Sequence, residues 1–183
     1  MVILVGLPFA FVIAVIILVD SPGSIFFVQN RVGRNNVDFS LLKFRTMHTN
    51  ADKSGLLTVG SDSRITRVGK FLRKFKIDEF PQFVNILKGD MSIVGPRPEV
   101  RKYVEMYSPE QMKVLSVRPG LTDYASIKYV NENEILANSD NPELTYIQNV
   151  MPDKLSLNIM YIENMSLTED FKIIFKTILA IFK

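Results

Sequence analysis

Residues 2–19 form an apolar run without a single charge, VILVGLPFAFVIAVIILV. As a helix that rises about 1.5 Å per residue, it would reach roughly 27 Å, close to the roughly 30 Å of a bilayer's hydrocarbon core. Its many Val, Ile, Leu and Phe side chains favour membrane insertion. A signal peptide would need a basic start and a small-residue cleavage site, and neither is visible. The run predicts a membrane-inserted helix over residues 1–20, with a buried core helix as the alternative.

Pro8 leaves two paths open for this helix. Proline lacks a backbone N–H and clashes with the carbonyl group four residues earlier, so a helix through Pro8 is expected to kink. With Gly6 nearby, the residues fit a re-entrant helix and a kinked spanning helix equally well. The two paths differ in whether Met1 and Asp20 lie on the same side of the membrane.

The side chains that are missing from the chain exclude several kinds of active site. There is no Cys, so disulfides, thiolate metal sites and cysteine nucleophiles are excluded, and His48 is the only histidine. A metal would therefore be held by carboxylates, which favour Mg²⁺ or Mn²⁺. The formal net charge of +3 is small, so the clustering of charge is more informative than its total.

The rest of the chain predicts one small α+β domain, mostly helical, over residues 21–183. The polar, mostly acidic segment Tyr129–Asp153 is expected to be a surface excursion. Alternating apolar residues predict a short β-hairpin, and apolar residues three or four apart predict helices. The expected elements are strands at Ser24–Gln29 and Val37–Phe44, and helices at Arg67–Lys76 and Phe80–Leu87, the last ended by Gly89.

The C-terminal segment, about residues 168–183, predicts an amphipathic helix. Ser166 and Glu169 have the spacing of a capping box at its start. Its three lysines share one face, and apolar side chains cover much of the remainder. Such a helix suits the bilayer interface, with its lysines near lipid phosphates. An ordinary core-packing helix that ends in a lysine tail is the alternative.

A basic run directly precedes two acids in the middle of the chain. Residues 64–76, RITRVGKFLRKFK, contain six basic residues and no acid, and Asp78 and Glu79 follow. Carboxylates beside concentrated positive charge suit a site for phosphates and a divalent ion. If Pro81 begins a helix, the helix dipole and nearby arginines would keep a carboxylate ionised, as a metal ligand or as a nucleophile that attacks phosphorus. A solvated basic face and a helix cap at Asp78 are the alternatives.

Arg97 stands between two prolines, Pro96 and Pro98. Proline fixes φ near −65°, so this arginine has little conformational entropy left to lose and is suited to bidentate phosphate binding. Arg118-Pro119-Gly120 repeats the pattern more weakly. A plain structural turn is the alternative for both arginines.

Six short motifs follow one another between residues 43 and 122, after the apolar run and before the amphipathic C-terminal segment. They are KFRTM at 43–47, GK at 69–70 with Arg73, DEFPQ at 78–82, NILKGDMS at 85–92, GPRP at 95–98 and RPGLT at 118–122. No single motif is specific, but in this order they resemble the bacterial sugar transferase family, the monotopic polyprenyl-phosphate phosphoglycosyl transferases.

The resemblance implies an enzyme that moves a sugar 1-phosphate from a nucleotide sugar, with UDP as the expected nucleotide, to undecaprenyl or another polyprenyl phosphate. This would be the first membrane step in building a capsule, O-antigen, exopolysaccharide or glycoprotein glycan. Asp78 is implied as the nucleophile of a covalent phosphosugar intermediate, and Glu79 as its partner in binding Mg²⁺ or Mn²⁺. The implied phosphate contacts are Arg73, Arg97, Arg118, Lys43 and Arg45.

The resemblance also implies a location and partners. The helix would be re-entrant and break near Pro8, and residues 21–183 would form a catalytic domain on the cytoplasmic face of the bacterial inner membrane. The expected partners are the nucleotide sugar, polyprenyl phosphate, the membrane and downstream glycosyltransferases, but no nucleic acid.

The chain departs from the family pattern at three places. Family members usually carry a basic stretch and more helix ahead of the equivalent of Pro8, and a truncated sequence or misassigned start would explain their absence. Leu7 stands where a serine is common. Residues 123–129, DYASIKY, replace a segment that often contains Gly and Gln, so no donor sugar is carried over.

Two other functions remain compatible with the residues. A membrane phosphohydrolase would use the same aspartyl-phosphate step with water as the acceptor. A non-enzymatic lipid-binding adaptor would use its basic face to meet anionic headgroups. Neutralising Asp78 and Glu79 would leave the adaptor's function intact, and only the transferase would require a lipid acceptor for turnover.

Overall fold

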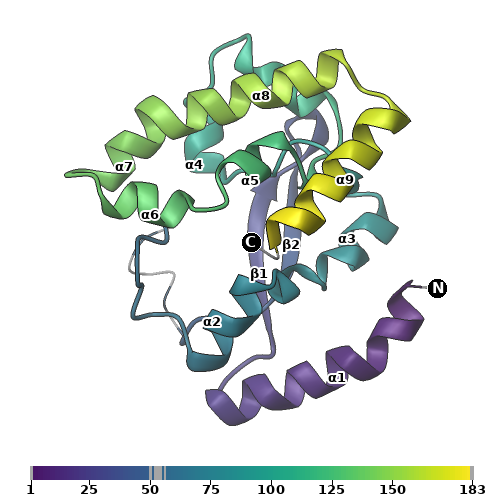
Figure 1. The fold of residues 1–183 in the computed structure, drawn as a ribbon, viewed down its shortest axis with the longest axis vertical. Helices are drawn as coiled ribbons and strands as arrows, with labels where there is room; N and C mark the ends of the chain where they lie inside the picture. Colours follow the sequence, from purple (N-terminus) through teal and green to yellow (C-terminus); the bar gives the residue numbers. More distant parts are fainter. Residues whose placement is uncertain (1, 50, 52–54, 56, 182–183) are drawn as a thin grey trace.

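The computed structural model describes residues 2–49, 51, 55 and 57–181. It is a mixed α and β structure in which helices predominate, as expected. Figure 1 shows a central β-hairpin, with α8 and α9 on one side and α1 and α2 at the opposite end of the molecule.

The first helix, α1 (Val2–Asp20), continues through Pro8. Figure 1 shows that its N-terminal part turns away from the direction of the rest. One face of α1 is buried through Ile13 and Ile17, which pack near Phe44 of the hairpin. Of the helices in the described residues, none has the length and apolar character required to cross a bilayer. The re-entrant path remains a prediction.

The expected hairpin is confirmed. Strand β1 (Phe26–Val32) pairs antiparallel with β2 (Asp38–Phe44), in a register that places Phe26 opposite Phe44. The first strand extends past its predicted end at Gln29, because Asn30 and Arg31 still pair with β2. This extension brings Arg31 to the end of the sheet that adjoins Glu99.

The basic run forms α2 (Arg67–Lys74). Thr66 caps its start, because the Thr66 hydroxyl accepts a hydrogen bond from the Gly69 N–H. A Cβ on Gly69 would overlap the backbone of Thr46, so only glycine permits this approach to the hairpin. Lys76 adopts the left-handed conformation, with φ of 57°, and reverses the chain into a 3₁₀ turn, Ile77–Glu79.

Helix α3 (Gln82–Lys88) follows and ends at Gly89, as predicted. Two three-residue strands, β3 (Ser92–Val94) and β4 (Gly120–Thr122), were not predicted and pair in parallel. Beyond β3, a Cβ on Gly120 would overlap the backbone of Gly95. The two arginine-proline motifs are therefore adjacent in space.

The prediction of a surface excursion at Tyr129–Asp153 is wrong. This segment supplies Leu136, Tyr146, Val150 and Met151 to the largest buried cluster. Its few apolar residues lie on one side of successive helical turns and form a buried face. The polar residues outnumber them, so composition alone did not indicate that face. The segment forms α6 (Glu132–Ala137), α7 (Pro142–Thr145), a π-helical turn (Tyr146–Val150) and the beginning of α8 (Met151–Glu163).

The last helix, α9 (Leu167–Ile181), begins where the capping pattern predicted, with the Glu169 N–H donating to the Ser166 hydroxyl. Residues 182–183, which the prediction included, lie outside the described residues. Ile173 is fully buried in the core, whereas Phe171 and Phe175 are mostly exposed. The described residues also form helices α4 (Arg101–Val104) and α5 (Tyr124–Lys128), and 3₁₀ turns at Arg34–Asn36 and Gln111–Ser116.

Candidate active site

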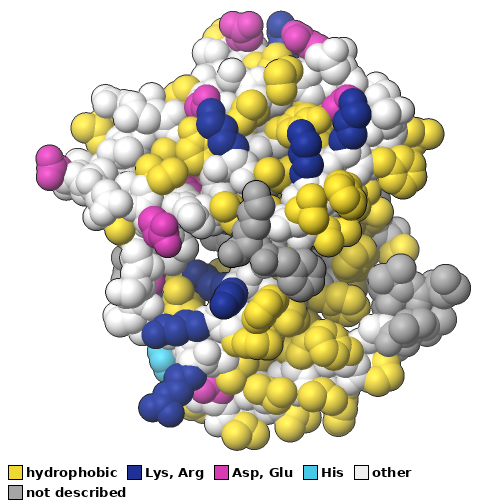
Figure 2. All heavy atoms as spheres, viewed as in Figure 1, with side chains coloured by type: hydrophobic (Ala, Val, Ile, Leu, Met, Phe, Trp, Pro, Cys, Tyr) yellow, Lys and Arg dark blue, Asp and Glu magenta, His cyan; other side chains and the backbone are white. Residues whose placement is uncertain are grey.

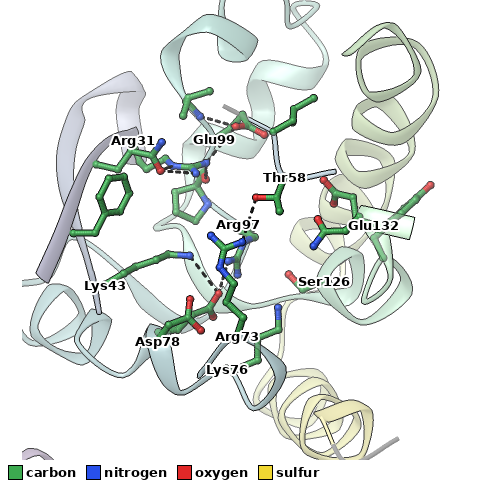
Figure 3. A pocket seen from close by; sticks show the side chains of 18 of the residues that line it. Arg31, Lys43, Thr58, Arg73, Lys76, Asp78, Arg97, Glu99, Ser126 and Glu132 are labelled. Carbon is green, nitrogen blue, oxygen red and sulfur yellow. Dashed lines mark hydrogen bonds and ion pairs between the residues drawn. The ribbon is translucent and has the colours of Figure 1, made fainter. Parts of the chain in front are cut away.

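A cavity of about 1130 Å³ lies between the hairpin, the 3₁₀ turn that carries Asp78 and Glu79, and α8. Its volume slightly exceeds the roughly 300–1,000 Å³ typical of ligand pockets. Figure 3 shows acidic and basic side chains from several elements converging on it. Segments far apart in the sequence therefore build one polar site.

Glu79 is paired with two cations inside this cavity. Its Oε1 accepts a hydrogen bond from Nη2 of Arg97 and lies 3.4 Å from Nζ of Lys43. Burial acts to raise the pKa of the Glu79 carboxyl, but the charges of Arg97 and Lys43 outweigh it and hold that pKa well below its usual range. Glu79 is therefore an ionised anchor for two cationic side chains.

Asp78 lies beside Glu79 but has no comparable partner. It is buried and lines the cavity, and its Oδ1 has no hydrogen-bond partner among the described residues. Burial raises the pKa of the Asp78 carboxyl, against the opposing charge of Lys43. Asp78 does not cap α3, because Pro81 occupies the N-cap position of that helix and no side chain makes a capping hydrogen bond. Asp78 is held instead as a poorly solvated carboxylate that can engage a ligand.

Cationic groups surround this carboxylate. Lys43, Arg73, Lys76 and Arg97 all line the cavity. Burial lowers the pKa of Lys43 to about 8, although the charge of Glu79 opposes this. Arg73 is oriented by two hydroxyl groups, since its Nε and Nη1 donate to threonine side chains at 46 and 58. This concentration of positive charge suits a diphosphate.

The Pro-Arg-Pro loop is held by residues that the sequence analysis did not identify. The Arg97 N–H donates to Oδ2 of the fully buried Asp123, at 3.1 Å. Nη1 of Arg31 donates to the Pro98 carbonyl at 3.0 Å and pairs with Glu99. Asp123 and Glu99 each directly follow one of the six motifs, and this position could have pointed to them. Nothing in the sequence around Arg31 indicated its contact with the Pro98 carbonyl.

Arg45 and Arg118, two of the expected phosphate contacts, are placed differently from the other three. Arg45 lines the cavity but is engaged with backbone carbonyls. The guanidinium group of Arg45 donates to the carbonyls of Ser21 and Pro22 and fastens the end of α1 to the hairpin. Arg118 is exposed and does not line the cavity. Lys43, Arg73 and Arg97 line the cavity together with the two acids. Phosphate binding by all five residues stays a prediction.

The acid pair fits a magnesium ion without further protein ligands. Within the described ranges, no three His, Cys, Asp or Glu side chains gather as a metal-binding group. Mg²⁺ in phosphate-handling sites is commonly held by one or two carboxylates, with substrate phosphates and water completing the shell. The unpartnered Oδ1 of Asp78 is a suitable ligand atom, and Glu79 lies next to it.

Comparison with known proteins agrees with these motifs. The bacterial sugar transferase family matches residues 1–183. The chain is similar to the UDP-N-acetylgalactosamine-undecaprenyl-phosphate N-acetylgalactosaminephosphotransferase of Aeromonas hydrophila, with 41% identity over 95% of this chain and 39% of that protein. It is also similar to the UDP-glucose:undecaprenyl-phosphate glucose-1-phosphate transferase of Caulobacter vibrioides, with 37% identity over 93% of this chain and 61% of that protein.

The chain thus spans about two fifths of the length of the first relative and about three fifths of the second. The family match nevertheless covers the whole of this chain. The chain belongs to the bacterial sugar transferase family.

Proposed function

We propose that the chain transfers a sugar 1-phosphate from a nucleotide sugar to undecaprenyl phosphate, at the start of polysaccharide synthesis. The observation that carries this proposal is the buried Asp78, whose Oδ1 has no hydrogen-bond partner among the described residues and which shares a cavity of about 1130 Å³ with four cationic side chains. The names of the relatives, which specify UDP-sugars and undecaprenyl phosphate, support the choice of donor and acceptor.

In the first step, a carboxylate oxygen of Asp78 attacks the phosphorus atom that bears the sugar. The new O–P bond forms as the bond to the nucleoside phosphate breaks, and the nucleoside monophosphate leaves with the electron pair. Arg97, Lys43 and Arg73 balance the charge of the phosphates. Their placement around Asp78 lowers the barrier, because the cations are already oriented before the substrate arrives.

In the second step, an oxygen of undecaprenyl phosphate attacks the same phosphorus. The acyl phosphate bond breaks, Asp78 recovers its carboxylate, and the sugar leaves on a lipid diphosphate. Asp78 and Glu79 would hold Mg²⁺, or alternatively Mn²⁺, which supplies further neutralisation of diphosphate charge when bound. Glu79 also keeps Arg97 and Lys43 in place through its ion pairs.

The lipid requirement tests this function against its alternatives. Purified protein is incubated with UDP-sugars, with and without undecaprenyl phosphate, and the release of UMP is measured. We expect continuous release only with the lipid, and at most one equivalent without it, because the covalent intermediate then accumulates. Continuous release without lipid would identify a phosphohydrolase, and no release under any condition would favour a non-enzymatic adaptor.

We further propose that the protein lies on the cytoplasmic face of the inner membrane through the apolar faces of α1 and α9. Figure 2 shows hydrophobic side chains gathered over α1 and toward α9. The exposed residues that argue for this include Phe11 and Val19 on α1, and Phe171 and Phe175 on α9. Exposed apolar surface of this extent is typical of a membrane contact.

Replacing both Phe171 and Phe175 by Glu is expected to weaken binding to anionic vesicles about tenfold, because two apolar anchors become charged. Flotation of the full chain with vesicles measures the bound fraction. Met106→Glu is the matched control, since Met106 is also exposed but lies outside this surface. Equal flotation of the double variant and the wild type would argue against the α9 contact.

A further inference from the structure

Two buried polar atoms on the far wall of the cavity have no use in the transfer chemistry described above. Asn158 on α8 is only 5% exposed, lines the cavity, and has an Oδ1 without a hydrogen-bond partner among the described residues. The hydroxyl oxygen of Ser126 on α5 also lines the cavity and is buried without a described partner. Buried polar groups normally find partners, so two unpartnered atoms on one cavity wall indicate a ligand.

These two residues come from helices that are fastened together. The Tyr129 hydroxyl donates to Oδ2 of Asp153 at 2.8 Å, and Lys128 pairs with the same carboxylate, which joins α5 to α8. Asn158 follows Lys154 by one helical turn, and both line the cavity. The wall formed by α5 and α8 is therefore a fixed surface rather than a loose loop.

The same wall is tied to the phosphate-binding arginine. The fully buried Asp123 accepts from the Ser126 N–H through Oδ1, at 2.6 Å, and from the Arg97 N–H through Oδ2. Figure 3 shows Ser126 across the cavity from Lys43 and Asp78, with Arg97 between them. A donor whose diphosphate contacts Arg97 would thus extend its remaining groups toward Ser126 and Asn158.

We propose that Asn158 and Ser126 form the recognition edge for an amide-like group of the donor, an N–H adjacent to a carbonyl. An asparagine amide can pair with such a group through one hydrogen-bond donor and one acceptor. A serine hydroxyl can act as a further donor or a further acceptor. The inference rests on the proposed function, because it assigns a part of the same donor. Two parts of a UDP-sugar have this chemistry, the imide of uracil and the N-acetyl group of an amino sugar.

Asn158→Leu tests the proposal with four probes: UMP, UDP, UDP-glucose and UDP-N-acetylglucosamine. Their affinities for the full chain are measured by calorimetry. We expect a loss of roughly tenfold to a hundredfold, as for a lost buried hydrogen-bonding pair. If the Asn158 amide binds uracil, all four probes lose affinity in the variant. If it binds the N-acetyl group, only UDP-N-acetylglucosamine loses affinity. Unchanged affinity for every probe overturns the proposal, and Ser126→Ala is expected to show the weaker form of the same pattern.

Two controls separate this role from others. Asn158→Leu removes an unpartnered buried polar group, so the melting temperature should stay level or rise, whereas a structural role predicts a fall. Asn164→Leu, at the C-cap of α8 and outside the cavity, should keep wild-type affinity for all four probes. A different result would contradict the proposed function itself: wild-type protein that binds the donors but releases no UMP in the presence of undecaprenyl phosphate.

Discussion

Asp78→Asn is expected to reduce transfer at least about a thousandfold, because an amide cannot act as the nucleophile in the covalent step. UMP release in the presence of undecaprenyl phosphate measures the rate. Mass spectrometry of the intact protein, after incubation with donor alone, measures the adduct. Wild type should gain the mass of one sugar phosphate, and Asp78→Asn should gain none.

The fold of this variant is expected to remain intact. Burial raises the pKa of the Asp78 carboxyl, which means that the folded state disfavours its charge, and a neutral amide of the same shape removes that cost. Asp140→Asn is the matched control, because Asp140 is exposed and lies outside the cavity. Full transfer activity in Asp78→Asn would rule out the nucleophile and with it the covalent mechanism.

Arg97→Ala is expected to lower turnover by about a hundredfold to a thousandfold, because one oriented cation is lost from the transition state. It should also lower the free energy of unfolding by about 1–3 kcal/mol. Breaking a buried ion pair costs roughly 3–5 kcal/mol, and here Lys43 remains as a second partner for Glu79. Denaturant unfolding and UMP release provide the two measurements.

Arg97→Lys separates the two effects. A lysine keeps the charge beside Glu79 but cannot present a planar fork to phosphate, so stability should recover more than activity. Arg101→Ala is the control, because its pair with Asp38 is largely exposed and should contribute less than about 1 kcal/mol. Wild-type turnover in Arg97→Ala would exclude a role for this arginine in phosphate binding.

The parts of the molecule that the sequence predicted well depend on local patterns. The hairpin was predicted from alternating apolar residues, and the end of α3 from Gly89. The acid pair and Arg97 were found because their motifs are short and contiguous. The gathering of Lys43 with these residues was implied by the family resemblance, and the structure brings them together.

The parts that were missed depend on contacts between distant residues. Strands of three residues, such as β3 and β4, are too short for any periodic signal. Arg45 lines the cavity, but its hydrogen bonds go to carbonyls just after the end of α1, a contact that no local pattern reveals. Asp123 directly follows the RPGLT motif, but its hydrogen bond to Arg97, 26 positions earlier, is seen only in the folded chain.

The close contact between Gly95 and Gly120 has a consequence for length variation. The two backbones meet so tightly that neither position accommodates a side chain. The intervening chain, with α4 and the turn at Gln111–Ser116, is therefore a loop pinned at its base. Its tip near Ser108 to Glu110 is exposed. Insertions at that tip should be tolerated, since loop-closure entropy grows slowly with length and the pinned base keeps Arg97 in position.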